Sequence, residues 1–145
     1  MRGVRIDFDA AKPIYQQIMD GLCRAVARGE LRPGDKVPSQ RDLALTLKVN
    51  PNTVQRAYRE MEREGLLETA RGRGTFITRD RPLLEGIRRR LAEEAVTAFV
   101  DELRALGLER EEMMELLRSR LESERGIRRD DDGADGEETP RPGRD

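Results

Sequence analysis

Two short helical patterns in the first half of the chain lie only about three residues apart, and this spacing constrains the fold more than any other feature. Ser39 can cap the first helix, whose apolar face runs from Leu43 to Leu47. Asn50 can cap the second helix, with Pro51 at the first helical position, where the missing N–H of proline costs nothing. The spacing predicts a helix-turn-helix.

The flanking residues extend this motif on both sides. A helical pattern with Pro13 at its first position precedes it and is expected to end at Gly29 in a left-handed cap. After it, two short β-prone segments surround the turn at 71–74, Arg-Gly-Arg-Gly, which predicts a hairpin. Residues 1–79 are therefore predicted to form a winged helix-turn-helix domain, and the fold class is mostly α with a small β-hairpin.

Residues 80–125 have a different pattern. A long amphipathic helix of about 24 residues begins near Arg81 and breaks at 106–108, and a second helix runs from Glu109 to about Glu124. Two such helices have little to bury against each other, so we expect a two-helix hairpin that dimerises with a second copy of the chain. The alternative is that the pair packs on its own winged domain. The predicted interface residues are Leu84, Ile87, Leu91, Ala95, Phe99, Leu103, Met113, Leu116 and Leu117.

Residues 126–145 are rich in Gly, Pro and acidic residues, and we expect a disordered acidic tail. With no His and a single Cys among 145 residues, a structural metal site and a Cys–His nucleophile are implausible. Cys23 is interpreted as a small buried hydrophobe. Neither a signal peptide nor an apolar run of about 18 residues is present, so we expect a cytoplasmic protein that does not span a membrane.

The net charge of −1 conceals two opposed halves. Residues 1–79 hold 15 Lys and Arg against 10 Asp and Glu, whereas residues 80–145 hold 13 against 19. A basic segment is the electrostatic pattern of a surface that meets phosphate. Together with the helix-turn-helix spacing, it points to nucleic acid as the partner of the first domain.

The polar residues at the start of each helix are candidates for this contact. Asn and Gln can bond adenine through two hydrogen bonds, Arg pairs with guanine, and a helix N-terminus favours phosphate. Arginines on a narrow wing can enter the minor groove. The candidate DNA-binding residues are Ser39, Gln40, Arg41, Asn50, Asn52, Thr53, Gln55, Arg56, Arg71, Gly72 and Arg73.

Blocks of sequence across residues 10–78 closely resemble the GntR family of bacterial transcription regulators. The blocks are KPIYQQI at 12–18, GELRPGDKVPSQRDLA at 29–44, VNPNTVQRAY at 49–58, EGLL at 64–67 and GRGTFI at 72–77. The short C-terminal part is similar to the YtrA-like subfamily, in which two helices mediate dimerisation. Many relatives have Arg at the position of Gln55, so the resemblance does not imply a particular operator sequence.

The resemblance implies a homodimeric repressor that binds double-stranded DNA at a palindromic operator. It also implies a position beside ABC-transporter genes and release by a small-molecule effector, whose chemical class the sequence does not specify. The family's DNA-contacting positions carry over to Arg41, Asn50, Asn52, Thr53, Gln55, Arg71 and Gly72.

Two other classes of function remain open from the residues alone. One is a non-specific architectural DNA-binding protein, and the other is a protein-interaction module with a winged fold. The Asn, Thr, Gln and Arg set at the helix starts argues against the second class. An enzyme is the least supported class, because no nucleophile, metal cluster or cofactor loop is apparent in the sequence, and we expect no cofactor.

Overall fold

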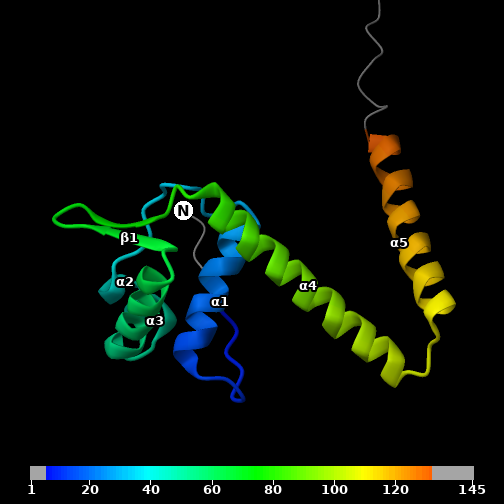
Figure 1. The fold of residues 1–145 in the computed structure, drawn as a ribbon, viewed down its shortest axis with the longest axis horizontal. Coiled ribbons are helices and arrows are strands. Elements are labelled where there is room, and N and C mark those ends of the chain that lie inside the picture. Colours follow the sequence, from blue (N-terminus) through cyan, green and yellow to red (C-terminus); the bar gives the residue numbers. More distant parts are fainter. Residues whose placement is uncertain (1–5, 132–145) are drawn as a thin grey trace, which may run out of the picture. The chain divides into compact units, whose positions relative to one another are not determined.

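The computed structural model describes residues 6–131, which contain five helices and one two-stranded antiparallel hairpin (Figure 1). The predicted fold class is confirmed. The chain divides into two compact units, one ending at Ala95 and the other beginning at Val96. The division falls inside a helix, and the predicted domain boundary after residue 79 stays a prediction.

The first helix, α1 (Ile14–Ala27), follows Pro13 directly. Its buried face includes Ile18 and Leu22, neither of which is exposed to solvent. Gly29 has a φ of 75°, the left-handed conformation that was predicted at this helix end. Pro13 and Gly29 therefore define the start and the end of this helix.

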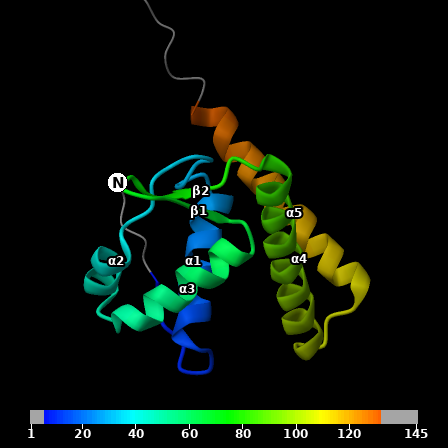
Figure 2. The ribbon, with the colours of Figure 1, turned by 60° about the vertical axis from the view of Figure 1, so that its left-hand side comes forward.

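The helix-turn-helix consists of α2 (Gln40–Leu47) and α3 (Pro51–Arg63), with the predicted caps in place. The Asp42 amide donates to Ser39 Oγ at 3.1 Å, and the Asn52 amide donates to Asn50 Oδ1 at 2.8 Å. Lys48 in the turn adopts a φ of 55°, which ends α2 sharply. Packing contacts join α3 to both α1 and α2, and Figure 2 shows α3 lying across α1.

One hydrophobic core holds the first unit together. It is built from the inward faces of the three helices and from the first and last residues of the hairpin. The fully buried side chains with the largest volume are Tyr58, Ile18, Leu22, Leu43, Met61, Leu66, Ile77 and Val54. Burial of each of these apolar side chains stabilises the fold by about 1.5–3 kcal/mol, so the core sets the orientation of α3.

The wing is formed by β1 (Leu67–Ala70) and β2 (Gly74–Ile77), with Ala70 opposite Gly74 beside the turn and Leu67 opposite Ile77 at the end away from it. The sequence did not predict that a third segment extends this sheet. The Val37 amide donates to the Thr75 carbonyl at 2.9 Å, and the Ile77 amide donates to the Asp35 carbonyl at 2.8 Å. Residues 35–37, which precede α2, thereby anchor the wing to the helix-turn-helix.

The next helix, α4 (Arg81–Ala105), begins where Asp80 Oδ1 accepts from the Leu83 amide at 3.1 Å. Leu84 is only 9% exposed and belongs to the core of the first unit, with Ile87 and Leu91 packed against that core. These three residues of the predicted dimer interface therefore contact the core of their own chain, and a role in an interface between copies stays a prediction. The start of α4 packs on its own winged domain because its apolar stripe continues the core beyond the hairpin.

The second unit comprises the end of α4 and α5 (Arg110–Asp131), with Gly107 between them at a φ of 82°. None of the residues from 96 to 125 is buried. The helix continues past the predicted end at Glu124, because a single glycine at 126 costs a helix only about 1 kcal/mol. The remainder of the predicted disordered tail, from residue 132, lies outside the described residues.

Within residues 6–131, no helix is both long enough and apolar enough to cross a membrane.

Candidate nucleic-acid interface

The outer face of α3 presents polar side chains to solvent. Because α3 buries Val54, Ala57, Tyr58 and Met61, its 3.6-residue period turns the opposite stripe outward. Asn52, Gln55, Arg56 and Arg59 are exposed, and Thr53 is half-buried. Amide side chains on a free helix face can bond base edges in the major groove. Asn50 is exposed too, although its side-chain oxygen is used by the cap.

The N-terminus of α2 forms a second polar surface. Ser39, Gln40 and Arg41 are all exposed, and Ser39 Oγ is occupied by the Asp42 amide. Within the part of the chain that the structure describes, Arg41 makes no ion pair. Its guanidinium is therefore available to a phosphate or to a guanine edge.

A hydrogen bond between Tyr58 and Pro38 connects these two surfaces. The Tyr58 hydroxyl donates to the Pro38 carbonyl at 2.6 Å, one residue before the Ser39 cap. Burial raises the pKa of Tyr58 above its usual range, so the hydroxyl keeps its proton and remains a donor. The helical period of the sequence indicates that Tyr58 faces inward, but it does not indicate what the hydroxyl contacts.

The three arginines of α3 have different surroundings. The guanidinium carbon of Arg56 lies 3.8 Å from the centre of the Tyr15 ring, and Arg63 pairs with Glu60 one turn earlier on the helix. No ion pair of Arg59 occurs among residues 6–125. Sequence reasoning missed Arg59, although its spacing of four residues from Gln55 places both on one face of the helix.

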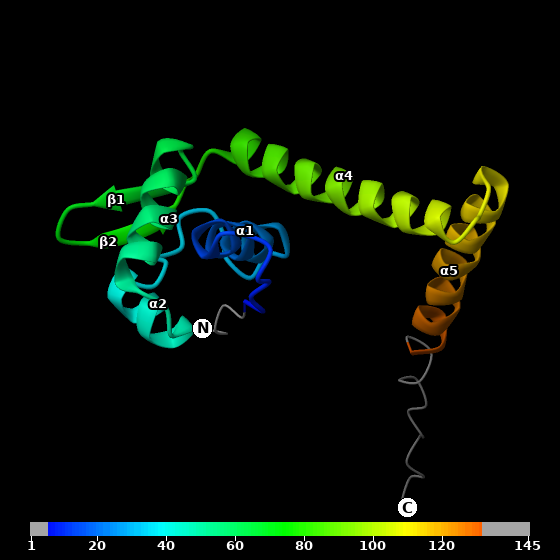
Figure 3. The ribbon, with the colours of Figure 1, turned by 90° about the horizontal axis from the view of Figure 1, so that it is seen from below.

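The wing places the predicted Arg71, Gly72 and Arg73 at its turn, all exposed. The Arg73 amide donates to the Ala70 carbonyl at 2.9 Å and closes the turn, and Gly72 adopts a φ of 77° that favours glycine. The views in Figures 1 and 3 agree that α2, α3 and the turn of the hairpin lie toward the same side of α1. All eleven predicted DNA-binding residues thus belong to the first compact unit.

Comparison with known proteins identifies this arrangement. The family model described as "Bacterial regulatory proteins, gntR family" matches residues 14–77. The transcriptional repressor YtrA of Bacillus subtilis is 38% identical over 130 residues, which is 88% of this chain and 99% of YtrA. The chain belongs to the GntR family. The predicted resemblance is confirmed, and it extends over both compact units.

Two further similarities agree with membership in the GntR family. The uncharacterized transcriptional regulator YhcF of Bacillus subtilis is 48% identical over 74% of this chain and 89% of its own length. A solved GntR-family regulator from Listeria monocytogenes has a TM-score of 0.69 at 36% identity, covering 77% of this chain and 98% of that one. These proteins are transcriptional regulators, which is a non-enzymatic role, and this GntR-family chain carries their DNA-binding helix-turn-helix.

Proposed function

We propose that the chain is a homodimeric transcriptional repressor that binds a palindromic operator. The observation that carries this proposal is the free polar stripe of α3, in which Asn52 and Gln55 are exposed on a helix oriented by a buried core. Side chains of this type read base edges in the major groove. The exposed Arg41 on α2 supplies a guanidinium group for a guanine edge, and the arginines of the wing supply cationic groups for the adjacent minor groove.

The homodimer is supported by apolar side chains that the second unit leaves in water. Phe99 is 42% exposed, Leu116 52% and Leu117 41%, and the second unit has no buried side chain up to residue 125. Apolar surface of this kind is stabilised by a partner that covers it. We propose that this partner is a second copy of the chain. The proposed interface residues are Ala95, Phe99, Leu103, Met113, Leu116 and Leu117.

A two-fold symmetric dimer predicts a two-fold symmetric site. Each recognition helix α3 would contact one half-site, so the operator is expected to be a palindrome with half-sites one helical turn or a multiple of it apart. Repression is proposed because YtrA is named a repressor. Because this chain is similar to the YtrA-like subfamily, we also propose that it regulates an ABC-transporter operon.

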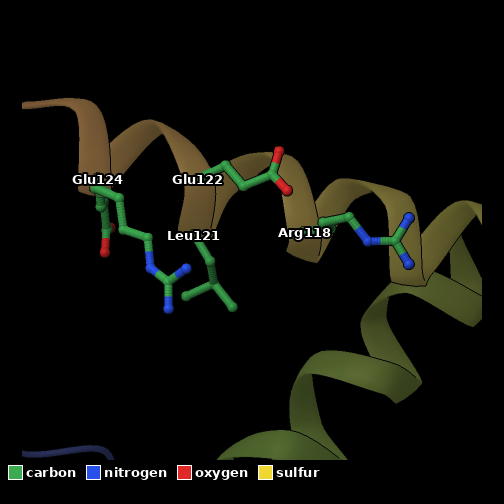
Figure 4. A pocket seen from close by; sticks show the side chains of 5 residues that line it. Arg118, Leu121, Glu122 and Glu124 are labelled. Atoms are coloured by element: carbon green, nitrogen blue, oxygen red, sulfur yellow. The ribbon is translucent and has the colours of Figure 1, made fainter.

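An effector site is proposed between the two copies rather than within one. On the second unit, Arg118, Leu121, Glu122, Glu124 and Arg125 line a shallow hollow (Figure 4). All five belong to α5, and a single helix cannot enclose a metabolite, since ligand sites bury most of the ligand surface.

The test of the proposed function is a fluorescence anisotropy titration with two duplexes, one from the region upstream of this gene and one with the same bases scrambled. A repressor is expected to bind the upstream duplex about 10³-fold or more tightly. Equal affinity for the two would indicate the non-specific architectural protein instead. Light scattering at tens of micromolar tests the dimer, and a monomer mass there would refute it.

A further inference from the structure

Lys36 lies in the segment 35–37, which pairs with the outer edge of β2. It stands opposite Phe76 of β2 in an antiparallel bridge, held by the Val37–Thr75 and Asp35–Ile77 backbone bonds. Directly opposed residues place their side chains on the same face of a sheet, and so do residues two apart on one strand. Lys36 and Gly74 therefore share one face of the wing.

Gly74 leaves the space through which the Lys36 side chain passes. A methyl group built on Gly74 would lie 2.6 Å from Lys36 Cε, 3.3 Å from Nζ and 3.6 Å from Cδ. The aliphatic stem of Lys36 thus crosses the position where any other residue would have its Cβ. Since Gly74 follows Arg73 directly, the Lys36 ammonium arrives at the base of the arginine turn from a distant part of the chain.

Two carboxylates of the wing, one beside Lys36 in the sequence and one across β2 from it, accept hydrogen bonds from other groups. Asp35 Oδ2 accepts from the Arg32 amide at 2.8 Å, and Glu68, which stands opposite Phe76 on β1, accepts from Thr78 Oγ1 at 2.8 Å. No ion pair of Lys36 occurs among residues 6–125. An ammonium held in place without an anionic partner is suited to an external anion.

We propose that Lys36 is a third cationic group of the wing and contacts a DNA phosphate beside the groove that Arg71 and Arg73 approach. This proposal rests on the proposed DNA-binding function. A phosphate rather than a base is the expected partner, because lysine acts as a point charge and its stem holds the ammonium behind the turn. The contact therefore strengthens binding to any duplex and carries no sequence preference.

The test measures how DNA affinity depends on salt, between 50 and 200 mM, for the full chain with the upstream and the scrambled duplexes. Lys36→Met keeps the stem over Gly74 and removes the charge, whereas Lys36→Arg keeps the charge. Arg28→Met is the matched control, since Arg28 is an exposed cation at the end of α1. Thermal unfolding of each variant checks that the fold is retained.

Lys36→Met is expected to reduce the slope of log affinity against log salt by about 1 per bound protomer, equally for both duplexes. Lys36→Arg and Arg28→Met are expected to keep the wild-type slope. An unchanged slope in Lys36→Met, or an equal reduction in Arg28→Met, would overturn the assignment. Failure of the proposed function gives a different result. The wild-type protein would then bind the two duplexes with equal affinity, and comparing the salt slopes of the wild-type protein and Lys36→Met would still test whether Lys36 contacts a phosphate.

Discussion

The guanidinium carbon of Arg56 on the recognition helix lies 3.8 Å from the centre of the Tyr15 ring on α1. Arginine stacks readily on an aromatic face, and such a pair contributes about 0.5–1 kcal/mol at an exposed site. Arg56 was predicted to bind DNA through its position on α3. The stack with Tyr15 gives it a second role, because it joins α1 to the helix that presents Asn52 and Gln55.

A double-mutant cycle tests the stack. Tyr15→Ala and Arg56→Ala should each destabilise the fold, with a coupling free energy of about 0.5–1 kcal/mol between them. Tyr15→Ala should also weaken operator binding, because it releases the Arg56 side chain, a predicted DNA contact, from its stacked position. The measurement is urea unfolding together with anisotropy, and Tyr15→Phe is the control, since its ring face is retained. Strict additivity of the two alanine variants would contradict a direct interaction.

Arg41→Ala is expected to weaken binding to the upstream duplex by about 1–3 kcal/mol and to relax base preference at one position of each half-site. The physical reason is that Arg41 is exposed on α2 and makes no ion pair with any side chain of residues 6–125. Anisotropy with a set of single-base variants of the duplex measures both effects. Arg28→Ala, which removes an equal charge at the far end of α1, should leave the base preference as it is. Wild-type affinity in Arg41→Ala would remove this residue from the interface.

Tyr58→Phe should reduce the free energy of unfolding by about 1–2 kcal/mol. The substitution keeps the buried ring and removes the hydroxyl that donates to the Pro38 carbonyl at 2.6 Å, leaving that acceptor without its partner. Urea denaturation measures the loss. Tyr15→Phe provides a comparison, because the Tyr15 hydroxyl accepts a hydrogen bond from the exposed Gln16 side chain. Equal stabilities for the two phenylalanine variants would mean that the Tyr58 bond contributes nothing.

Leu84→Ala and Phe99→Ala distinguish the intrachain core from the proposed dimer surface, although both residues were predicted to lie in one interface. Leu84→Ala should destabilise the winged unit by about 2–3 kcal/mol, because it leaves a cavity in a core position. Phe99→Ala should instead raise the dimer dissociation constant. Unfolding of the winged unit and sedimentation equilibrium separate the two effects. A wild-type dissociation constant for Phe99→Ala would exclude this residue from the interface.

The buried thiol of Cys23 is expected to lower the free energy of unfolding in alkaline solution. Burial raises the pKa of the thiol from 9.0 to about 11, so the folded chain holds its proton more tightly than the unfolded chain does. The stabilisation is complete below pH 9 and is lost as pH rises toward 11, by roughly 2–3 kcal/mol. Comparing Cys23→Ala with the wild-type protein by urea denaturation at pH 8 and pH 10.5 isolates this contribution. If both chains lost the same stability between these pH values, Cys23 would not be its source.

Local features of the fold were predictable from sequence. The Ser39 and Asn50 caps, the left-handed Gly29 and the hairpin after Gly65 all depend on residues within a few positions of one another. Backbone preferences and capping hydrogen bonds act over that short range, so the local sequence is sufficient to predict these features. The helical period also placed Asn52 and Gln55 on the free face of α3, since it placed Val54 and Tyr58 inside.

The long-range contacts were decided only by the tertiary structure. Asp35 to Val37 pair with β2, Arg56 contacts Tyr15, and Leu84 enters the core of the winged unit. Each of these contacts joins residues that are far apart in the chain. A periodic pattern indicates which face of a helix is apolar, but it does not indicate which other segment packs against that face. The sequence by itself determined a winged helix-turn-helix with an outward polar stripe. Packing decided which arginine and leucine side chains remain exposed to a partner. The intrachain groups that would otherwise contact these side chains are distant in the sequence and are brought close only by folding.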